Sequence, residues 1–246
     1  MPLTLQNFSY ATFLSVDFGG STGSGFRLSC FNKEYLITAK HVVFEKIYDI
    51  YGKIVSHKPR LNIAITSQNS LGNRAYAYEA DVDLAKSKIK LFGDSDLCLI
   101  ELEGGKNYTV NNSGYQITVA DENDLLQLDS ISIASQILIV GFPSSLLNPE
   151  IFDVQRPLLR TGIVAGINEA NKTFIIDSPA FYGNSGGAVI QITDNNLHII
   201  GVVSKYIPFV TEWFNTREKE FSRQEFYNSG YAICEPLDEI IDYLKP

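Results

Sequence analysis

The clearest chemical signal in this chain is the stretch Asp177-Ser-Pro-Ala-Phe-Tyr-Gly-Asn-Ser-Gly-Gly-Ala-Val-Ile190. Its centre places Ser185 among glycines, which tolerate positive φ and a close approach of a substrate to the backbone. A tight turn of this composition can expose a hydroxyl and aim backbone N–H groups at one point. Ser185 is therefore a candidate nucleophile. The same residue types also form ordinary turns between strands, and this alternative stays open on the stretch alone.

A serine hydroxyl becomes a nucleophile when a base takes its proton and a third group orients that base. The chain has three histidines. His57 lies in a polar stretch that reads as a surface loop, and His198 lies in an apolar strand. His41 instead ends the alternating run that begins at Glu34 and opens a short apolar turn. A strand that leads into this position would fix an imidazole at a rim, so His41 is the candidate base.

The candidate acid lies in Gly93-Asp-Ser-Asp-Leu-Cys-Leu-Ile-Glu-Leu102. Asp96 directly precedes an apolar segment, where its carboxylate could be partly buried and directed at an imidazole N–H. Asp94 lies further out in the turn, and both aspartates could simply cap that turn. The order of His41, Asp96 and Ser185 in three compatible contexts is less expected by chance than any one of them.

The ordered set of short motifs resembles a chymotrypsin-fold, trypsin-like serine peptidase, and is most similar in style to bacterial HtrA/Deg-type catalytic domains. The resemblance runs from about residue 15 to the end of the chain and rests on these pieces: Thr22-Gly-Ser-Gly-Phe26, Thr38-Ala-Lys-His41, Asp96-Leu-Cys-Leu-Ile100, Val140-Gly-Phe-Pro143, Ser178-Pro-Ala-Phe-Tyr-Gly-Asn-Ser-Gly-Gly187 and Gly230-Tyr-Ala-Ile233. HtrA-type enzymes usually carry a PDZ domain, for which no residues remain here. PDZ-gated regulation is therefore not expected.

The resemblance implies a separate catalytic role for each candidate residue. Ser185 attacks a peptide carbonyl, His41 acts as general base and then general acid, and Asp96 orients the imidazole. Backbone N–H groups of Gly183 and Ser185 form the oxyanion hole, and Asn184 shapes the same turn. Asn184 is neutral where the digestive enzymes carry an aspartate that pairs with a new N-terminus. We therefore expect no trypsinogen-like proteolytic activation.

The resemblance also places a substrate pocket beside the nucleophile. Pro179 occupies the position at the pocket floor, six residues before Ser185, where an acid would select basic side chains. We therefore expect small or medium apolar side chains at P1, with Tyr206 narrowing the pocket. The full set of expected substrate-binding residues is Pro179, Ala180, Phe181, Tyr182, Ser204, Lys205 and Tyr206.

Composition limits the other possibilities. The 246 residues are 45% hydrophobic, and no apolar run approaches the length of a membrane span. The formal net charge of −8 argues against a nucleic-acid partner. No metal-ligand spacing or nucleotide-binding fingerprint is present, so neither a metal nor a cofactor is expected. Three cysteines, an odd number, and the lack of a signal-like N-terminus favour buried thiols in a reducing cytoplasm.

Short runs rich in β-branched and aromatic residues recur between Gly, Asn, Asp and Ser turns, which indicates an all-β fold. We predict two six-stranded antiparallel β-barrels with a C-terminal α-helix. The expected strands are 25–31, 35–38, 61–66, 75–80, 88–91 and 97–102 in the first barrel, and 137–140, 161–167, 173–176, 188–192, 198–204 and 231–234 in the second. A single peptidase domain, 1–246, would comprise a barrel over 1–118, a linker over 119–130, a barrel over 131–235 and a helix over 236–245.

The helix prediction rests on Leu237, Ile240, Ile241 and Leu244, whose spacing gives one apolar face, with proline at the first turn. The segment from Tyr206 to Gly230 is longer than a minimal connection and rich in aromatic residues. Two interpretations are open for it. The favoured one is a surface helix that packs its aromatics on the barrel, and the other is a lid or partner-docking element beside the pocket.

The function predicted from these patterns is a serine endopeptidase that acts on protein or peptide substrates, with a partner or loop ordering as a possible activator. Two other classes remain as alternatives. A catalytically silent peptide-binding or scaffold protein would keep the fold without turnover, and a hydrolase of small esters would use the same three residues.

Overall fold

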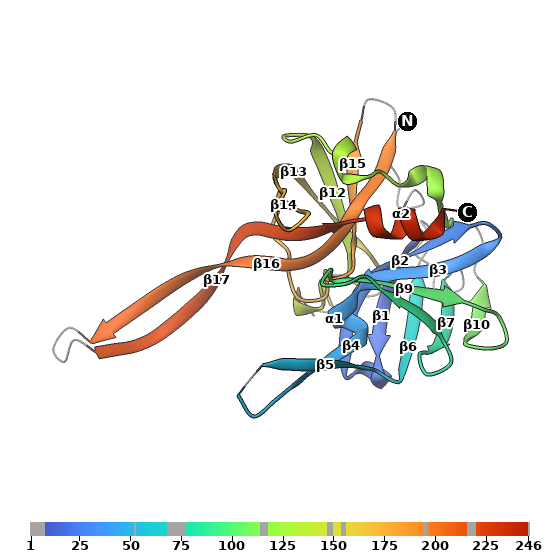
Figure 1. The fold of residues 1–246 in the computed structure, drawn as a ribbon, viewed down its shortest axis with the longest axis horizontal. Coiled ribbons are helices and arrows are strands. Elements are labelled where there is room, and N and C mark those ends of the chain that lie inside the picture. Colours follow the sequence, from blue (N-terminus) through green and yellow to red (C-terminus); the bar gives the residue numbers. More distant parts are fainter. Residues whose placement is uncertain are drawn as a thin grey trace.

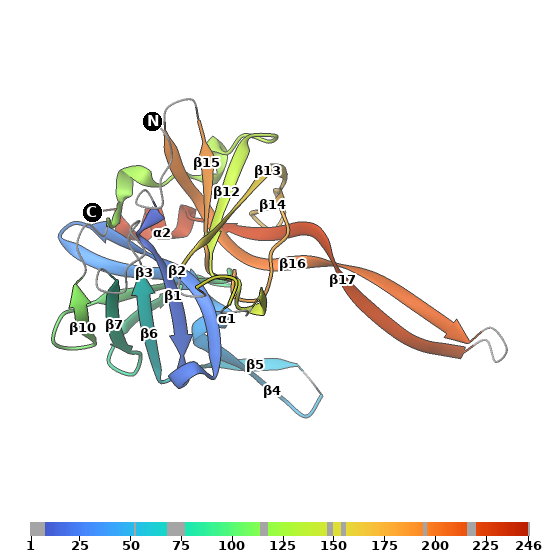
Figure 2. The same ribbon diagram turned by 180° about the vertical axis from the view of Figure 1, so that it is seen from behind.

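The structure is a computed structural model, and it describes residues 8–51, 53–67, 77–113, 118–146, 150–153, 156–193, 196–215 and 220–245. Strands dominate these residues and form two large sheets that lie against each other (Figure 1). A separate two-stranded hairpin and a second, much longer hairpin project from this body on the same side in Figures 1 and 2.

The first large sheet has nine strands in the order β10-β7-β6-β1-β2-β3-β9-β8, with β11 pairing β2 in parallel. Six of them correspond to the six predicted strands, and β1, β10 and β11 are additional. The bounds are β1 Ala11–Val16, β2 Ser21–Cys30, β3 Lys33–Ala39, β6 Asn62–Ser67, β7 Tyr78–Asp83, β8 Lys88–Leu91, β9 Leu97–Leu102, β10 Tyr108–Ser113 and β11 Ala120–Asp121.

The second sheet is a closed barrel, β12-β13-β14-β17-β16-β15, and its six strands match the predicted number. Closure removes the two free edges that an open sheet exposes. The bounds are β12 Gln136–Gly141, β13 Leu158–Asn168, β14 Thr173–Asp177, β15 Ala188–Ile192, β16 Leu197–Asn215 and β17 Glu220–Pro236.

Strand β12 shows why the two sheets pack as one body. Successive side chains of a strand point to opposite faces. Ile137 and Ile139 lie in the core of the closed barrel. Leu138 and Val140 belong instead to the larger core that also contains side chains of the first sheet. One strand therefore contributes to both cores, and the seam between the sheets is filled with buried aliphatic groups.

The predicted linker is ordered by hydrogen bonds. After β11 pairs with β2, the short 3-10 helix Glu122–Asp124 begins with a capping box in which Asp121 accepts from the Asn123 N–H at 2.7 Å. The strands of the first sheet end at Asp121 and those of the barrel begin at Gln136. The domain bounds within this interval stay a prediction.

The C-terminal helix α2, Asp238–Leu244, confirms the predicted amphipathic helix. Leu237 and Ile240 are fully buried, and Ile241 and Leu244 pack against the large core. Pro236, expected in the first turn, is the last residue of β17. A strand therefore runs directly into the helix and fixes it beside the sheets.

The segment predicted as a surface helix is a β-hairpin, so that prediction is wrong. Strands β16 and β17 pair from Gly201↔Pro236 out to Asn215↔Glu220 and extend far beyond the barrel (Figure 1). We call the part from Pro208 to Asn228 the arm. Side chains on both of its faces are exposed, and the exposed apolar ones are Phe209, Val210, Trp213, Phe214, Phe226 and Tyr227.

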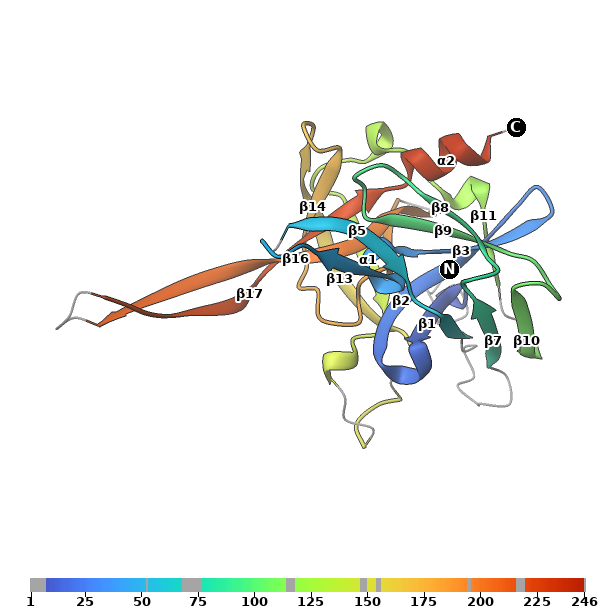
Figure 3. The same cartoon turned by 60° about the horizontal axis from the view of Figure 1, so that its bottom comes forward.

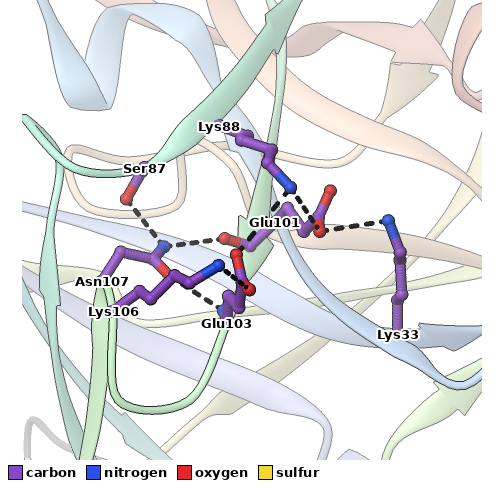
Figure 4. A network of polar contacts seen from close by, with 7 residues as sticks. All are labelled: Lys33, Ser87, Lys88, Glu101, Glu103, Lys106 and Asn107. Atoms are coloured by element: carbon purple, nitrogen blue, oxygen red, sulfur yellow. Dashed lines mark hydrogen bonds and ion pairs between the residues drawn. The ribbon is translucent and has the colours of Figure 1, made fainter.

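A polar network fixes one corner of the first sheet (Figure 4). On β9, Glu101 accepts from Lys33 of β3 at 3.1 Å and from Lys88 of β8 at 3.3 Å. Asn107 is buried, donates to the Glu101 carbonyl at 2.7 Å and accepts from the Glu103 N–H at 2.8 Å. The exposed ion pairs contribute little stability, whereas the satisfied buried amide holds the turn between β9 and β10.

Candidate active site

The first sheet positions His41 against Asp96. Strand β3 ends at Ala39, and the short helix α1, Lys40–Val43, begins directly after it. The pairing of β3 with β9 brings this junction beside the start of β9, where the Lys40 N–H donates to the Asp96 carbonyl at 2.7 Å. The His41 Nδ1 and Asp96 Oδ2 lie 2.7 Å apart, and the His41 backbone N–H donates to Asp96 Oδ1 at 3.1 Å. Both carboxylate oxygens therefore contact one residue.

A residue of the barrel completes the surroundings of this acid. Ser204, on β16, donates its hydroxyl to Asp96 Oδ2 at 2.7 Å. Burial by itself raises the pKa of Asp96, but the hydrogen bonds and charge of His41 and the Ser204 hydroxyl outweigh it. The pKa of the carboxyl therefore lies below its ordinary value of 3.8. Asp96 is ionised at neutral pH and can stabilise a positive imidazolium.

Ser185 follows a tight turn whose geometry depends on glycine. The Asn184 N–H donates to the Phe181 carbonyl at 2.9 Å, and Gly183 has φ +94°. These are the features of a type II turn, which needs positive φ at its third residue. The buried Asn184 side chain accepts from the Phe181 N–H at 3.3 Å, so its amide oxygen is satisfied within the turn.

This turn orients a backbone donor toward the cleft. The Tyr182 carbonyl accepts from the Ser145 N–H at 3.3 Å. In a trans peptide the N–H points opposite to the carbonyl, so the Gly183 N–H is directed away from Ser145. Within the described residues, the N–H groups of Gly183 and Ser185 donate to no protein atom. Two donors are thus free to bind an oxyanion.

Two glycines around the nucleophile have no room for a side chain. A Cβ at Gly183 would lie 2.3 Å from the Phe142 carbonyl oxygen, and one at Gly186, which has φ +85°, would lie 2.0 Å from the Ser24 carbonyl oxygen. The glycine pattern in the sequence therefore reflects both a positive φ and a close approach of other backbone, from the segment after β12 at Gly183 and from the first sheet at Gly186.

Ser24 of β2 was not singled out by sequence reasoning, yet it holds the nucleophile turn. Its hydroxyl donates to the Gly183 carbonyl at 2.6 Å and accepts from the Phe142 N–H at 2.9 Å. Its backbone N–H donates to the Ser185 carbonyl at 2.8 Å, and the residue is fully buried. The only signal in the sequence was its place in a motif of the resemblance. The first sheet thus fixes the turn that belongs to the barrel.

The Ser185 hydroxyl donates to the Ser204 carbonyl at 3.4 Å, and no hydrogen bond joins it to His41 within the described residues. A contact of this length is weak. Nucleophile and base are often further apart without substrate and approach each other when it binds. Ser185 and His41 line the same cleft. The Ser185 hydroxyl would therefore have to leave the Ser204 carbonyl before it could donate to His41.

The cleft between the two sheets has a volume of about 1180 Å³. Of the seven predicted substrate-binding residues, Pro179 does not line it, and the other six do: Ala180, Phe181, Tyr182, Ser204, Lys205 and Tyr206. Residues of β4, Phe44–Tyr48, and β5, Ile54–Pro59, line its other side. Figure 3 shows this hairpin beside α1, across from the start of the arm.

The rings of Tyr182 and Tyr206 meet at the pocket wall. Their centroids lie 6.3 Å apart at an interplanar angle of 81°, which is an edge-to-face contact. The side-chain hydrogen bond between Tyr206 and Tyr182 raises the pKa of Tyr206, because it stabilises the protonated Tyr206 hydroxyl. Behind them, Asn228 at the base of the arm donates to the Ala180 carbonyl at 2.6 Å. The arm is thus tied to the segment that precedes the nucleophile.

Glu235 is a second residue that sequence reasoning missed. It lies on β17 and accepts from the Ser95 hydroxyl at 3.0 Å. Burial raises the pKa of Glu235, and the charge of the neighbouring Asp96 raises it further, while the hydrogen bond from Ser95 partly offsets both. The barrel therefore supports the turn that carries Asp96 from a second side.

The remaining candidates lie elsewhere or play no part in this arrangement. His57 is exposed on β5 rather than in a loop, and it lines the cleft. His198 lies on β16 opposite Gln191, and its Nδ1 is buried without a partner in the described residues. Asp94 lines the cleft in the turn before β9.

The predicted thiols are indeed buried and unpaired, at Cys30, Cys98 and Cys234. Over the ranges that the structure describes, no three His, Cys, Asp or Glu side chains form a group that could hold a metal ion. In the same ranges, no helix is long and apolar enough to cross a membrane.

Two packed β sheets, with a histidine and an aspartate on the first sheet and a glycine-flanked serine on the barrel, are typical of the trypsin-like peptidases. A family model described as the trypsin-like peptidase domain matches residues 23–202. The chain therefore belongs to the trypsin-like peptidase family, and the predicted resemblance is confirmed. No curated protein matches the sequence.

Solved structures support the same fold. One is a serine endoprotease from Yersinia pestis, with a TM-score of 0.53 and 15% identity over 99% of this chain and 67% of that one. Another is the thermostable serine protease AL20 from an extremophilic microorganism, with a TM-score of 0.58 and 12% identity over 97% of each chain. The predicted all-β, chymotrypsin-like fold with a C-terminal helix is therefore confirmed.

Proposed function

We propose that this protein is a serine endopeptidase that cleaves peptide bonds through His41, Asp96 and Ser185. The observation that carries the proposal is one cleft that combines three features. These are a histidine hydrogen-bonded to a half-buried, ionised aspartate, a serine that follows a glycine-containing turn, and two backbone N–H donors beside that serine that bind no protein atom in the described residues. Trypsin-like family membership favours a protein or peptide substrate over a small ester.

In this mechanism, the Ser185 hydroxyl turns from the Ser204 carbonyl toward His41 Nε2 as the substrate binds. His41 takes the proton while Ser185 Oγ bonds to the scissile carbonyl carbon, and Asp96 stabilises the imidazolium that forms. His41 then gives the proton to the leaving amine, which departs and leaves an acyl-enzyme. Water then attacks the carbonyl carbon of the acyl-enzyme, with His41 again as base. His41 returns the proton to Ser185 Oγ, and the acid product is released.

The negative charge on the carbonyl oxygen in these steps would be stabilised by the N–H groups of Gly183 and Ser185. Each such donor typically contributes about 3 kcal/mol to lowering the barrier. The donors cost little reorganisation because the type II turn already directs them, and Ser24 keeps that turn in place.

For specificity, we propose a small or medium apolar side chain at P1. Pro179, expected at the pocket floor, does not line the cleft, and the lining residues Ala180, Phe181 and Tyr182 supply no carboxylate there. The Tyr182–Tyr206 contact narrows the approach to the pocket. Cleavage of a peptide library would test this preference, and products dominated by Lys or Arg at P1 would exclude it. We also propose that the protein is located in the cytoplasm, where its free thiols would stay reduced. We further propose that a partner activates it by ordering the cleft.

A fluorophosphonate probe, which labels activated serines, tests the proposal directly. The wild-type chain should be labelled, and Ser185→Ala, His41→Ala and Asp96→Asn should lose most or all labelling while keeping the wild-type circular dichroism spectrum. Turnover of peptides as well as esters would then separate a peptidase from an esterase. A folded wild-type chain that is never labelled and cleaves no peptide would instead indicate a silent peptide-binding protein.

A further inference from the structure

The hydrogen-bonding edge of β16 changes partner at the nucleophile. Strand β15 pairs with β16 as far as Val202. The next contacts on this edge come from the nucleophile turn: the Gly186 N–H donates to the Val203 carbonyl at 2.8 Å, and the Val203 N–H donates to the Gly187 carbonyl at 2.9 Å. Ser185 then donates to the Ser204 carbonyl. Beyond Ser204, no strand among the described residues pairs with this edge.

Strand β16 nevertheless continues to Asn215, because β17 pairs with its opposite edge along the whole arm. Pro208 within this run is compatible with an edge, since proline cannot donate to a neighbouring strand. The pairing of β16 with β17 shifts register between Val203 and Lys205 and again between Tyr206 and Pro208, and is then regular from Pro208 to Trp213. The open edge of β16 therefore begins beyond Ser204 and follows the arm, which leads away from the barrel (Figures 1 and 2). Such an edge is a template for an extended polypeptide, which adds to it as a further strand.

We propose that the open edge of β16 on the arm, from Pro208 to Phe214, binds substrate residues that lie further from the scissile bond, on its N-terminal side. This inference rests on the proposed function and specifies its substrate class: unfolded polypeptides and long flexible segments rather than short peptides. At about 3.3 Å per residue the seven residues span roughly 23 Å, which is room for a substrate segment of comparable length.

Strand direction decides which side of the scissile bond is bound. β16 runs outward from Ser204, so a chain that pairs with it in antiparallel fashion runs inward and brings its C-terminal end to Ser185. That end carries the carbonyl that Ser185 attacks. The leaving amine must face His41, which belongs to the first sheet on the other side of the cleft. The segment along the arm is therefore the acyl side of the substrate.

The side chains of the arm fit such an occupant. Cross-strand pairing places Phe209 opposite Tyr227 and Trp213 opposite Arg223, and Val210 lies opposite Phe226. Exposed apolar groups thus occur on both faces of the ribbon. Because an added strand points alternate side chains to the two faces, it would contact both sets.

The charged groups near these rings are already paired with each other. Trp213 Nε1 donates to Glu225 at 3.1 Å, and Arg223 lies 2.9 Å from the same carboxylate. The Arg223 guanidinium also stacks on the Trp213 ring, with 5.6 Å to its centroid. Recognition along the arm should therefore come from backbone hydrogen bonds and apolar contact rather than from substrate charge. This selects extended, apolar-rich segments, which unfolded chains expose and folded proteins bury.

The test uses full-length Ser185→Ala protein, fluorescent peptides and anisotropy. One peptide spans P4 to P2′, and a second carries eight further apolar and polar residues on its N-terminal side. A third carries the same extension on its C-terminal side. We expect the N-terminal extension to tighten Kd by about 10-fold or more, and the C-terminal one by about 2-fold at most. N-methylation of alternate amides in the N-terminal extension should remove most of the gain.

An arm-shortened variant provides the matched comparison. Val210 and Phe226 are cross-strand partners, so Thr211 to Glu225 can be replaced by an Asn-Gly turn. This variant should bind the short peptide as before and lose the gain from the N-terminal extension. Trp213→Ser should weaken the long peptide alone, whereas Tyr51→Ser, which removes an exposed ring from the other hairpin, should change neither.

Equal affinity for short and long peptides, a gain from the C-terminal extension instead, or equal loss of both peptides on shortening the arm would each overturn the inference. So would sedimentation showing that the arm joins two copies of the chain and that the long peptide does not compete. Fluorophosphonate labelling of the wild-type and arm-shortened chains keeps the proposed function separate. Labelling without a length effect refutes only the inference, and its absence refutes the proposed function whatever the binding shows.

Discussion

The two halves of the candidate site are held by different means. On the first sheet, His41 and Asp96 are fixed by side-chain hydrogen bonds to each other and to Ser204. In the barrel, Ser185 is placed by backbone conformation, with a positive φ at Gly183 and contacts that leave no space for a Cβ. The first half should therefore be sensitive to the loss of a polar group, and the second to the gain of a single carbon atom.

The largest expected effect tests whether these differently built halves act as one unit. Ser185→Ala and His41→Ala should each lower kcat by about 10⁴-fold or more, and the double variant should be little worse than either. Single-turnover kinetics on one peptide would measure all three. His57→Ala, which removes another cleft histidine, should stay within a few-fold of wild type. Effects that multiply in the double variant would show that Ser185 and His41 work independently.

The next effect concerns Gly183, whose N–H is one of the two proposed oxyanion donors. Gly183→Ala should lower kcat by about 10² to 10³-fold, because a Cβ forces the turn and its N–H out of position. Gly166→Ala is the matched control in the same barrel, since its Cβ would meet nothing within 4 Å. Steady-state kinetics and a crystal structure of the variant would check this. Near wild-type activity for Gly183→Ala would mean that the turn is free to adopt another donor geometry.

A smaller effect is expected from the hydroxyl that reaches Asp96 across the seam. Ser204→Ala removes one charge-assisted hydrogen bond, and a loss of about 10-fold in kcat/KM is expected if that bond orients the acid. Ser95→Ala removes a hydroxyl from the adjacent residue that serves Glu235 instead, and it should cost less. The comparison would be reversed if Ser95→Ala proved the more damaging, since Glu235 would then be the main support of Asp96.

The smallest effect is a change in acid stability. The pKa of Asp96 is lower in the folded chain than in the unfolded one, so the unfolded state binds more protons and stability falls as pH drops through this range. Asp96→Asn should flatten the loss of unfolding free energy below about pH 4, measured by urea denaturation. The pKa of Glu235 is raised, so its sign is opposite, and Glu235→Gln should relieve destabilisation above the ordinary glutamate pKa.

Much of the fold could be predicted because local pattern and tertiary environment agree. The predicted strands 88–91, 97–102 and 188–192 have the observed bounds of β8, β9 and β15. The candidate residues His41, Asp96 and Ser185 line one cleft, as their motifs indicated. Their catalytic roles remain the proposal to be tested.

The errors have physical causes. The helix predicted for the arm is wrong because the arm lacks the usual sequence signal of a strand. Its aromatic residues do not alternate with polar ones. On a ribbon with both faces exposed, no buried face imposes the alternation that marks a strand. Local composition also cannot reveal that Ala120 and Asp121, at the start of the predicted linker, pair with β2, because this is a tertiary contact. Ser24 and Glu235 matter through contacts with Gly183 and Ser95, far away along the chain.

The contacts between the first sheet and the barrel determine when the candidate site can form during synthesis of the chain. His41, Asp96 and Ser24 leave the ribosome first, Ser185 follows, and Ser204 and Glu235 come later still. The carboxylate of Asp96 and the turn at Ser185 each need a partner from the other half. A nascent chain therefore cannot assemble the complete arrangement until its last strand has joined the barrel. During synthesis, the unfolded remainder of the same chain therefore does not meet a completed candidate site.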